Sequence, residues 1–227
     1  MVADSSHVSF SNIICEEMSA SALARGTGIA KRTPEYISMK MLEGKAVIAF
    51  DQSGIWAGFC YIETWSHGQY VANSGLIVSP MFRKSGLAKS IKKKIFELSR
   101  SNYPEAKIFG LTTGLAVMKI NSELGYEPVT YSELTQDDAF WAGCKSCVNF
   151  DILTSKERKN CLCTAMLFDP AEHNTNANVL STEKDKQARF SLYERFMRIK
   201  QGLLLKNFIR FVSQRIHLPS QLALLKK

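Results

Sequence analysis

The chain has 227 residues, of which 45% are hydrophobic and 22% are charged, as in an ordinary globular protein. It has no uncharged apolar run as long as the ~18 residues of a membrane-spanning helix, so we expect no transmembrane segment. The net charge is +8, but residues 188–227 carry nine of the 29 Lys and Arg residues and only one of the 21 Asp and Glu residues. The rest of the chain is therefore neutral, which argues against nucleic-acid binding, because such binding needs a basic face.

The N-terminal segment MVADSSHVSF has neither the basic head nor the apolar core of a signal peptide, so we expect a cytoplasmic protein. After it, apolar spacing and turn residues divide the chain into helices and strands. The predicted elements are, in chain order, helices at 8–24 and 34–42, strands at 45–51, 55–65 and 70–80, a helix at 86–100, a strand at 107–113 and a helix at 114–125. No clear strand precedes residue 24, which leaves the N-terminal edge of the sheet undefined.

Three hairpin-linked strands followed by helix, strand and helix predict an α+β (mixed α/β) fold, with a central mixed twisted sheet flanked by helices. We expect this domain to span 1–170 and a polar linker to span 171–187. Residues 188–227 predict a basic amphipathic helical tail. Its apolar stripe favours packing on the domain or on a second copy, as in a homodimer; binding at a membrane surface is the alternative.

The segment LIVSPMFRKSGLAKSI predicts an anion-binding site. A buried strand ends at Pro80, and a helix begins near Gly86, so free backbone N–H groups and the positive end of the helix dipole point at one spot. Gly86 and Ala88 are small enough for a diphosphate to approach the backbone, and Arg83 and Lys84 add positive charge.

This segment resembles the pyrophosphate-binding segment of the GNAT superfamily of acyl-CoA-dependent N-acyltransferases, and INSELGYEPV resembles its closing helix-to-strand corner. The resemblance covers about residues 35–130 and implies the GNAT fold, with acetyl-CoA as the acyl-donor substrate. It implies that the coenzyme is bound at the splay between strands 70–80 and 107–113 and at the start of helix 86–100. The residues that it assigns to the coenzyme are Leu76, Ile77 and Val78 beside the pantetheine, and Arg83, Lys84, Ser85, Gly86, Leu87 and Ala88 around the pyrophosphate.

One position departs from the family pattern. The family often has a tyrosine four residues before the glycine of the closing corner, and this tyrosine protonates the departing CoA thiolate. Here that position is Asn121. Asparagine hydrogen-bonds but is no acid, so Asn121 would contact the coenzyme while Tyr126, another group or solvent supplies the proton. A thiol pKa of about 8.5 makes the thiolate a tolerable leaving group even without an acid.

The loop RGTGIAKR gathers Arg25, Lys31 and Arg32 around two glycines. In the GNAT fold this segment lines the acceptor side of the cleft, and paired hydrogen bonds from arginine suit an acceptor with carboxylates. The alternative is a solvated basic loop without a ligand.

A closer resemblance is carried by RGTGIAKRTPEYI, AGFCYIETWSHGQYVANSGLIV, KIFGLTTGLAVMKINSELGY and FWAGCKSCVNFDIL. Together they look like a short bacterial type of N-acetylglutamate synthase that lacks an amino-acid-kinase domain. This resemblance implies acetyl transfer to the α-amine of L-glutamate, at the start of arginine synthesis.

The same chemistry assigns roles to individual residues. Glu63 is the candidate base for the substrate ammonium, and an exposed strand residue without a catalytic role is the alternative. His67 is a competitor for the base, but its place in SHG favours an ordinary turn residue. A backbone N–H of Ile77 or Val78 would meet the oxyanion. Thr112 and Thr113 are candidate substrate-binding residues, although threonines are also ordinary strand residues. Two rival functions remain: a GNAT acylating another small amine or a protein N-terminus, and a non-catalytic acyl-CoA-binding regulator.

Four cysteines, at Cys144, Cys147, Cys161 and Cys163, are enough for a tetrahedral zinc site. If 147–154 and 162–168 formed a hairpin, Cys147 and Cys163 would lie ~15 Å apart and could not share a metal. A folded-back connection that begins with a capping box at 154–157 would close this gap. We expect no metal and buried, reduced thiols.

Overall fold

The computed structural model describes residues 1–26 and 30–173, and none of the helices in these ranges is both long and apolar enough to cross a membrane. The predicted tail, and the predicted linker from residue 174 onward, lie outside the described residues. The helices and strands are α1 (Ser11–Arg25), α2 (Pro34–Leu42), β1 (Ala46–Phe50), β2 (Trp56–Trp65), β3 (Tyr70–Val78), α3 (Leu87–Asn102), β4 (Lys107–Thr112), α4 (Leu115–Glu123), β5 (Glu127–Val129), α5 (Asp138–Ala142), α6 (Phe150–Ser155) and β6 (Thr164–Phe168).

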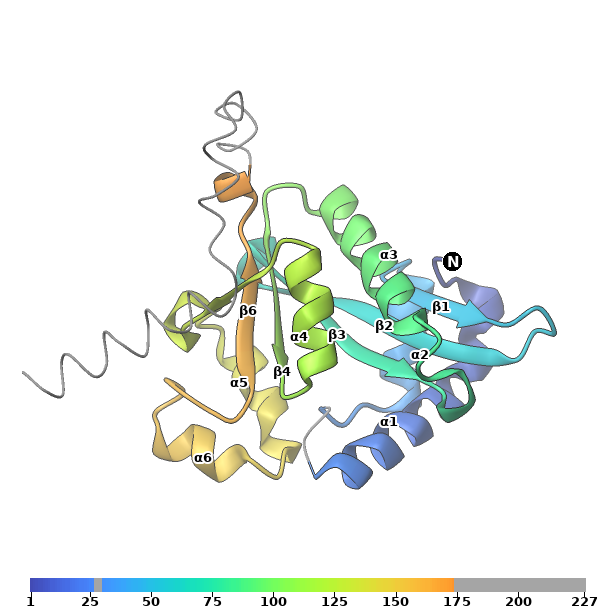
Figure 1. Cartoon of the computed structure of the whole chain (residues 1–227), viewed down its shortest axis with the longest axis horizontal. Helices are drawn as coiled ribbons and strands as arrows, with labels where there is room; N and C mark the ends of the chain where they lie inside the picture. Colours follow the sequence, from blue (N-terminus) through green and yellow to red (C-terminus); the bar gives the residue numbers. More distant parts are fainter. Residues whose placement is uncertain (27–29, 174–227) are drawn as a thin grey trace, which may run out of the picture. The chain divides into compact units, whose positions relative to one another are not determined.

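A six-stranded mixed sheet in the order β1-β2-β3-β4-β6-β5 forms the centre of the described region (Figure 1). β1, β2 and β3 are antiparallel neighbours, β3 and β4 are parallel, and β6 is antiparallel to both β4 and β5. The single parallel pair arises because α3 connects β3 to β4 as a crossover, whereas short turns join the first three strands. The predicted fold class is confirmed.

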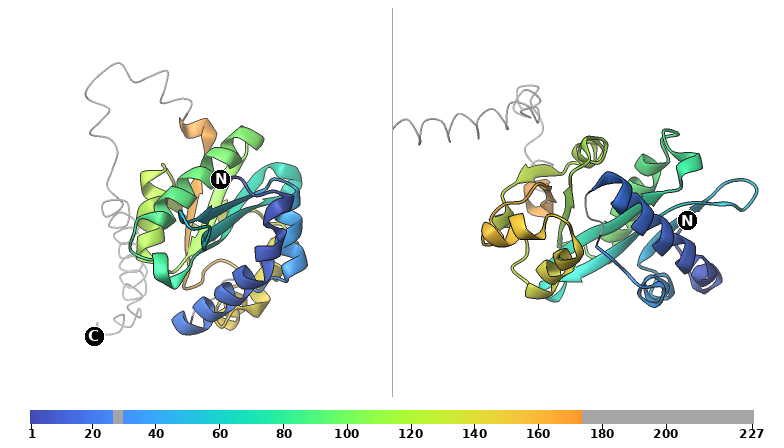
Figure 2. Two further views of the ribbon diagram at one scale, coloured as in Figure 1. Left: turned by 90° about the vertical axis from the view of Figure 1, so that its right-hand side faces the viewer. Right: turned by 90° about the horizontal axis from the view of Figure 1, so that it is seen from below.

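Helices cover both faces of the sheet, because successive strand residues point to opposite faces. On β2, Phe59 and Tyr61 pack with α1 and α2, whereas Cys60 and Ile62 pack on the face that carries α3 and α4. The left-hand view of Figure 2 shows the sheet between α3 (green) and α1 (blue). The ion pair of Lys89 with Glu123, 2.8 Å long, joins α3 to α4.

β3 and β4 separate soon after they begin. They pair only where Tyr70–Ala72 faces Lys107–Phe109, and the remainder of β3 pairs with β2 alone. A β-bulge then sets Gly75 and Leu76 opposite Cys60, with Gly75 in the left-handed region at φ +64°. The parallel ladder thus ends beside an extra twist of β3, which opens the sheet at its centre.

The N-terminus closes the edge of the sheet that the sequence leaves undefined. Val2 forms an isolated antiparallel bridge with Val47 of β1. The amide of Ala3 donates to the carbonyl of Ala46 at 2.8 Å, and the amide of Ile48 donates to the carbonyl of Met1 at 3.1 Å. This single bridge is too short to show as a strand in the sequence pattern.

The hairpin considered for 147–154 and 162–168 is wrong in its first half. Residues Phe150–Ser155 form helix α6, and the segment 162–168 contains the strand β6. Leu153 of α6 is buried and Phe150 packs against the same core, so apolar residues three apart favour a helix here. The capping box at 154–157 is also wrong, because Thr154 lies in the last turn of α6, where its hydroxyl bonds the carbonyl of Phe150 at 2.9 Å.

Candidate active site

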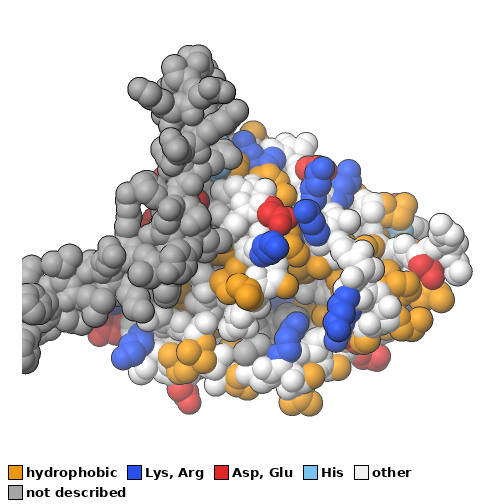
Figure 3. Space-filling view, in the orientation of Figure 1, with side chains coloured by type: hydrophobic (Ala, Val, Ile, Leu, Met, Phe, Trp, Pro, Cys, Tyr) orange, Lys and Arg blue, Asp and Glu red, His pale blue; other side chains and the backbone are white. Residues whose placement is uncertain are grey.

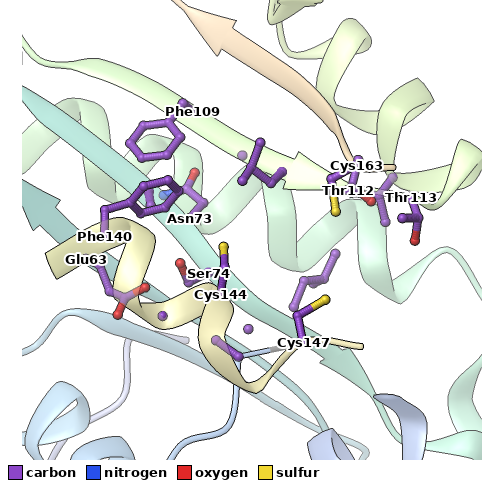
Figure 4. Close-up of a pocket in the computed structure, with 18 of the residues that line it drawn as sticks. Glu63, Asn73, Ser74, Phe109, Thr112, Thr113, Phe140, Cys144, Cys147 and Cys163 are labelled. Carbon is purple, nitrogen blue, oxygen red and sulfur yellow. The ribbon is translucent and has the colours of Figure 1, made fainter. Parts of the chain in front are cut away.

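A cavity of about 260 Å³ lies where β3 and β4 separate. Figure 4 shows Glu63 at one side of it, and Thr112 and Thr113 at the end of β4 on the other side. Of the residues singled out from the sequence, the cavity is lined by Arg25, Arg32, Glu63, Leu76, Thr112, Thr113, Asn121, Cys144, Cys147, Cys161 and Cys163. Those that do not line it are Lys31, Ile77, Val78, Tyr126 and the segment 83–88.

The start of α3 offers free backbone donors to an anion. Gly86 is its N-cap, at φ +85°, and no side chain caps the helix. The first amides of a helix have no carbonyl partner within it, so they face outward here. In the loop before it, Lys84 also adopts a positive φ, +63°, and the hydroxyl of Ser85 donates to the carbonyl of Phe82 at 2.6 Å. The face that carries α3 and α4 is hollowed between the beginnings of these two helices (Figure 3).

Arg83 is already engaged by its own chain. Its guanidinium donates to Glu17 at 2.7 Å and to Ser21 at 2.9 Å, both on α1, and its Nε donates to the carbonyl of Val78 at 3.2 Å. These bonds fasten the loop before α3 to α1. The positive charge of Arg83 is therefore partly compensated before any ligand arrives.

The edge of β3 that faces the splay carries backbone without a strand partner. Ile77 and Val78 pair with Phe59 and Gly58 of β2, and no described strand pairs with them on the other side. Their side chains pack into the cores on the two faces of the sheet, which explains why only Leu76 of this segment lines the cavity.

Glu63 and Arg32 form a buried ion pair. The Nη2 of Arg32 donates to Oε1 of Glu63 at 2.9 Å, and the hydroxyl of Tyr36 donates to the same oxygen at 2.5 Å. Only 4% of Glu63 is exposed. Burial lowers the pKa of Arg32, but Tyr61 and Glu63 outweigh it and raise this pKa above its ordinary value. The Nε of Arg32 is buried, and it has no hydrogen-bond partner among the described residues.

The other two cations of the loop lie differently. Arg25, the last residue of α1, lines the cavity, and no ion pair within the described residues engages it. Burial, followed by the nearby Arg83, lowers its pKa. Lys31 is exposed and lies outside the cavity, and its backbone amide donates to Ser146 at 3.2 Å. His67 is exposed in a turn at φ +56° and does not line the cavity either.

Asn121 and Tyr126 are both buried but face different surroundings. Asn121 lines the cavity, and its Nδ2 is 3.8 Å from the sulfur of Met166. Its Oδ1 has no hydrogen-bond partner within 1–26 and 30–173. Tyr126 lies behind the cavity, and its hydroxyl donates to Asn73 at 3.0 Å. Burial raises the pKa of the Tyr126 phenol, and Asn73 in turn donates to Ser99 of α3 at 2.7 Å.

The four cysteines lie together along the cavity wall as free thiols. The chain folds back through α6 between Cys147 and Cys161, so it follows the folded-back course, although without the capping box, and not the hairpin. Burial, followed by the neighbouring thiols, raises the pKa of Cys144 to about 11 and that of Cys163 to about 12. No group of three or more His, Cys, Asp or Glu residues in 1–26 and 30–173 is arranged to hold a metal ion.

Three residues of the site escaped the sequence reasoning. Tyr36 was seen only as part of a helix, Phe140 lies in a segment without a predicted element, and Lys92 was one of several cations on helix 86–100. Lys92 did carry a signal. It follows Ala88 by four residues and precedes Ile95 by three, so it lies on the apolar side of an amphipathic helix.

The fold is the GNAT fold. N-acetylglutamate synthase from Neisseria gonorrhoeae, in complex with coenzyme A and N-acetyl-glutamate, is similar with a TM-score of 0.53 and 16% identity over 74% of this chain and 34% of that chain. Rv2747 from Mycobacterium tuberculosis, in complex with CoA, is similar with a TM-score of 0.53 and 16% identity, over 74% of this chain and 97% of that chain. The yncA protein from Salmonella typhimurium, with acetyl-CoA, is similar with a TM-score of 0.52 and 13% identity, over 75% of this chain and 92% of that chain.

These likenesses concern the fold. This chain spans about a third of the Neisseria chain but nearly all of the other two. No protein-family profile matches the sequence, and no curated protein does.

Proposed function

We propose that this protein is an acetyl-CoA-dependent N-acetyltransferase that acetylates the α-amine of L-glutamate. The observation that carries the proposal is the cavity at the splay of β3 and β4, which Arg25 and Arg32 line, together with the uncapped start of α3, the helix whose Lys92 also lines this cavity. In the proposed complex the diphosphate of the coenzyme binds at the start of α3, and the carboxylates of glutamate bind at the arginines.

The residues present fit coenzyme A. A diphosphate needs several donors at short range, and the uncapped start of α3 provides backbone amides and the positive end of a sixteen-residue helix. Pantetheine carries amide groups, and the unpaired edge of β3 at 76–78 provides backbone partners for them. Acetyl-CoA supplies an activated acetyl group as a thioester.

The acceptor side of the cavity supports an anionic substrate. Arg25 and the free Nε of Arg32 are its candidate partners, and Thr112 and Thr113 are candidate neighbours of the bound amino acid. Glu63 is held by Arg32 and Tyr36 through one oxygen, so its second oxygen is the candidate acceptor for the substrate ammonium proton. Holding amine and thioester together would supply much of the rate.

Thiol release from acetyl-CoA, measured with different acceptors, tests the proposal. Release that depends on L-glutamate supports it. Release with other small amines or with peptide N-termini, but not with glutamate, contradicts the acceptor assignment while keeping an N-acetyltransferase. Binding of acetyl-CoA without turnover with any amine contradicts both and favours an acyl-CoA-binding regulator.

Arg25→Ala tests the acceptor assignment directly. A charged hydrogen bond contributes about 1.5–3 kcal/mol, so this variant should raise the KM for glutamate by about 10- to 100-fold and leave the KM for acetyl-CoA nearly unchanged. Lys145→Ala is the matched control, because Lys145 is exposed outside the cavity. Equal losses for both substrates would contradict the role of Arg25.

A further inference from the structure

Lys92 is a buried lysine at the splay of the sheet. It lies on α3, only 2% of it is exposed, and it lines the cavity. Within the described part of the chain, no carboxylate forms an ion pair with it, and its Nζ lies 5.6 Å from the ring centre of Tyr126. Burying an ammonium group without a carboxylate costs free energy, so this position calls for a negative charge that residues 1–26 and 30–173 do not provide.

Asn121 contributes a second buried polar side chain to the same cavity. It comes from α4, across the splay from α3, and its buried Oδ1 lacks a partner. Its Nδ2 lies 3.8 Å from where a Cβ of Gly110 would be, so the side chain sits over β4 beside the point where the strands separate. Asparagine is short and has no proton to give, whereas lysine is long and carries one.

We propose that Lys92 stabilises and protonates the thiolate that leaves during acyl transfer. This inference rests on the proposed function, but not on the identity of the acceptor. As the bond between the acyl carbon and sulfur breaks, its electron pair goes to the sulfur. The ammonium of Lys92 donates a proton to that sulfur, which yields the thiol of coenzyme A and a neutral lysine amine, and water then returns a proton to the amine.

The surroundings of Lys92 suit this step. Burial lowers its pKa, whereas the nearby Cys60 thiol works in the opposite direction. A lower pKa brings the ammonium closer to a thiol pKa of about 8.5, and matched values favour proton transfer. In the part of the chain that the structure describes, the titratable groups that face Lys92 are the Cys60 thiol on β2 and the Tyr126 phenol, and burial raises the pKa of both.

The test measures the pKa of the thiol of bound coenzyme A, followed by thiolate absorbance during a pH titration of the full-length protein. We expect the bound thiol of the wild type to titrate at least about one pH unit below free coenzyme A, because a nearby cation stabilises the thiolate. Lys92→Met and the polar variant Lys92→Gln should both lose this shift. Lys93→Met, on the same helix but with 68% of the side chain exposed, should keep it.

Turnover supplies a second measurement with whichever amine proves active. Lys92→Met should lower kcat about 100-fold and change the KM for acetyl-CoA little, because loss of a general acid affects the chemical step. A thiol pKa that is equal in the wild type and in both Lys92 variants would overturn the proposal. So would a failure of coenzyme A to bind, which would also end the proposed function. Absence of turnover with glutamate alone would end only the acceptor assignment.

Discussion

Arg32 is one of the three loop cations predicted to bind a substrate, yet a carboxylate of its own chain already engages it. Its pair with Glu63 leaves one buried Nε donor free, and Tyr36 shares the same carboxylate oxygen. This triad fixes both charged side chains at the cavity wall. Its members therefore act as one unit, and replacing any of them affects the other two.

We expect Lys92 to lower the stability of the fold while it contributes to activity. An unpaired buried cation destabilises the fold, so Lys92→Met should raise the free energy of unfolding by about 1–3 kcal/mol at neutral pH. The folded state lowers the pKa of Lys92, so folded protein binds fewer protons than unfolded chain at pH values between the folded pKa and about 10.4. The increase in the free energy of unfolding caused by Lys92→Met is therefore full at pH values below the folded pKa of Lys92, and it shrinks as the pH rises toward about 10.4. Urea unfolding across this range measures it.

The control for that measurement is Lys93→Met. Lys93 is exposed and lies 4.0 Å from Glu97, so its loss should change the free energy of unfolding by less than about 0.5 kcal/mol at any pH. A Lys92→Met protein that is less stable than the wild type at neutral pH would contradict the unpaired state of the cation.

At the scale of elements, the bulge of β3 opens the sheet. Gly75 has φ +64°, and a Cβ there would lie 2.3 Å from Cε1 and 2.9 Å from Cδ1 of the buried Tyr61. Gly75→Ala should therefore lower the free energy of unfolding by about 2–4 kcal/mol, through backbone strain and overpacking, and weaken coenzyme binding. Thermal unfolding and a CoA titration measure the two effects.

Gly54→Ala separates these two causes. Gly54 has φ +79° in the turn between β1 and β2, and nothing lies within 4 Å of its Cβ position. This variant should lose only the strain term, about 1 kcal/mol, and bind coenzyme A normally. Equal losses in the two variants would mean that contact with Tyr61 does not define the bulge.

At the start of α3, one substitution should favour the stability of the helix but weaken the binding of coenzyme A. Ala88 lies in the first turn, where a carboxylate stabilises a helix by about 0.3–1 kcal/mol but repels a diphosphate. Ala88→Glu should leave stability unchanged or slightly higher and raise the Kd for coenzyme A at least about tenfold. Ala88→Gln, equal in size but uncharged, should bind several-fold better than Ala88→Glu. Similar affinities of the two variants would argue against a diphosphate at this helix end.

At the scale of the whole molecule, the sequence predicts the fold well as far as Gly125. Hairpin turns, a strand that ends at a proline and an amphipathic helix are each determined by residues close together in the sequence. Such patterns can be recognised without knowledge of tertiary contacts. Beyond Gly125 the chain relies on long-range packing. Trp141 of α5, for example, packs with Leu153 of α6 and Phe109 of β4 in one core. α6 is a short helix that this core supports, so local patterns alone left a hairpin strand and a folded-back connection both open at these residues.

The sequence predicts those site residues that lie close together along the chain. It does not predict those that come together only when distant segments of the chain pack against one another. The loop before α3 and the arginines near residue 30 could be named from local patterns. The contact of Tyr36 with Glu63 joins residues 27 apart, and the gathering of four cysteines depends on the course of α6. Lys92 was hidden for another reason: its burial becomes visible only when α4 and the splay are in place.

The most direct test of the account is a crystal structure of the protein with coenzyme A. We predict diphosphate oxygens within hydrogen-bond distance of the backbone amides of 85–88, and pantetheine between β3 and β4 with its sulfur near Lys92. Coenzyme bound elsewhere, or a loop before α3 that holds a side chain in place of the diphosphate, would contradict it.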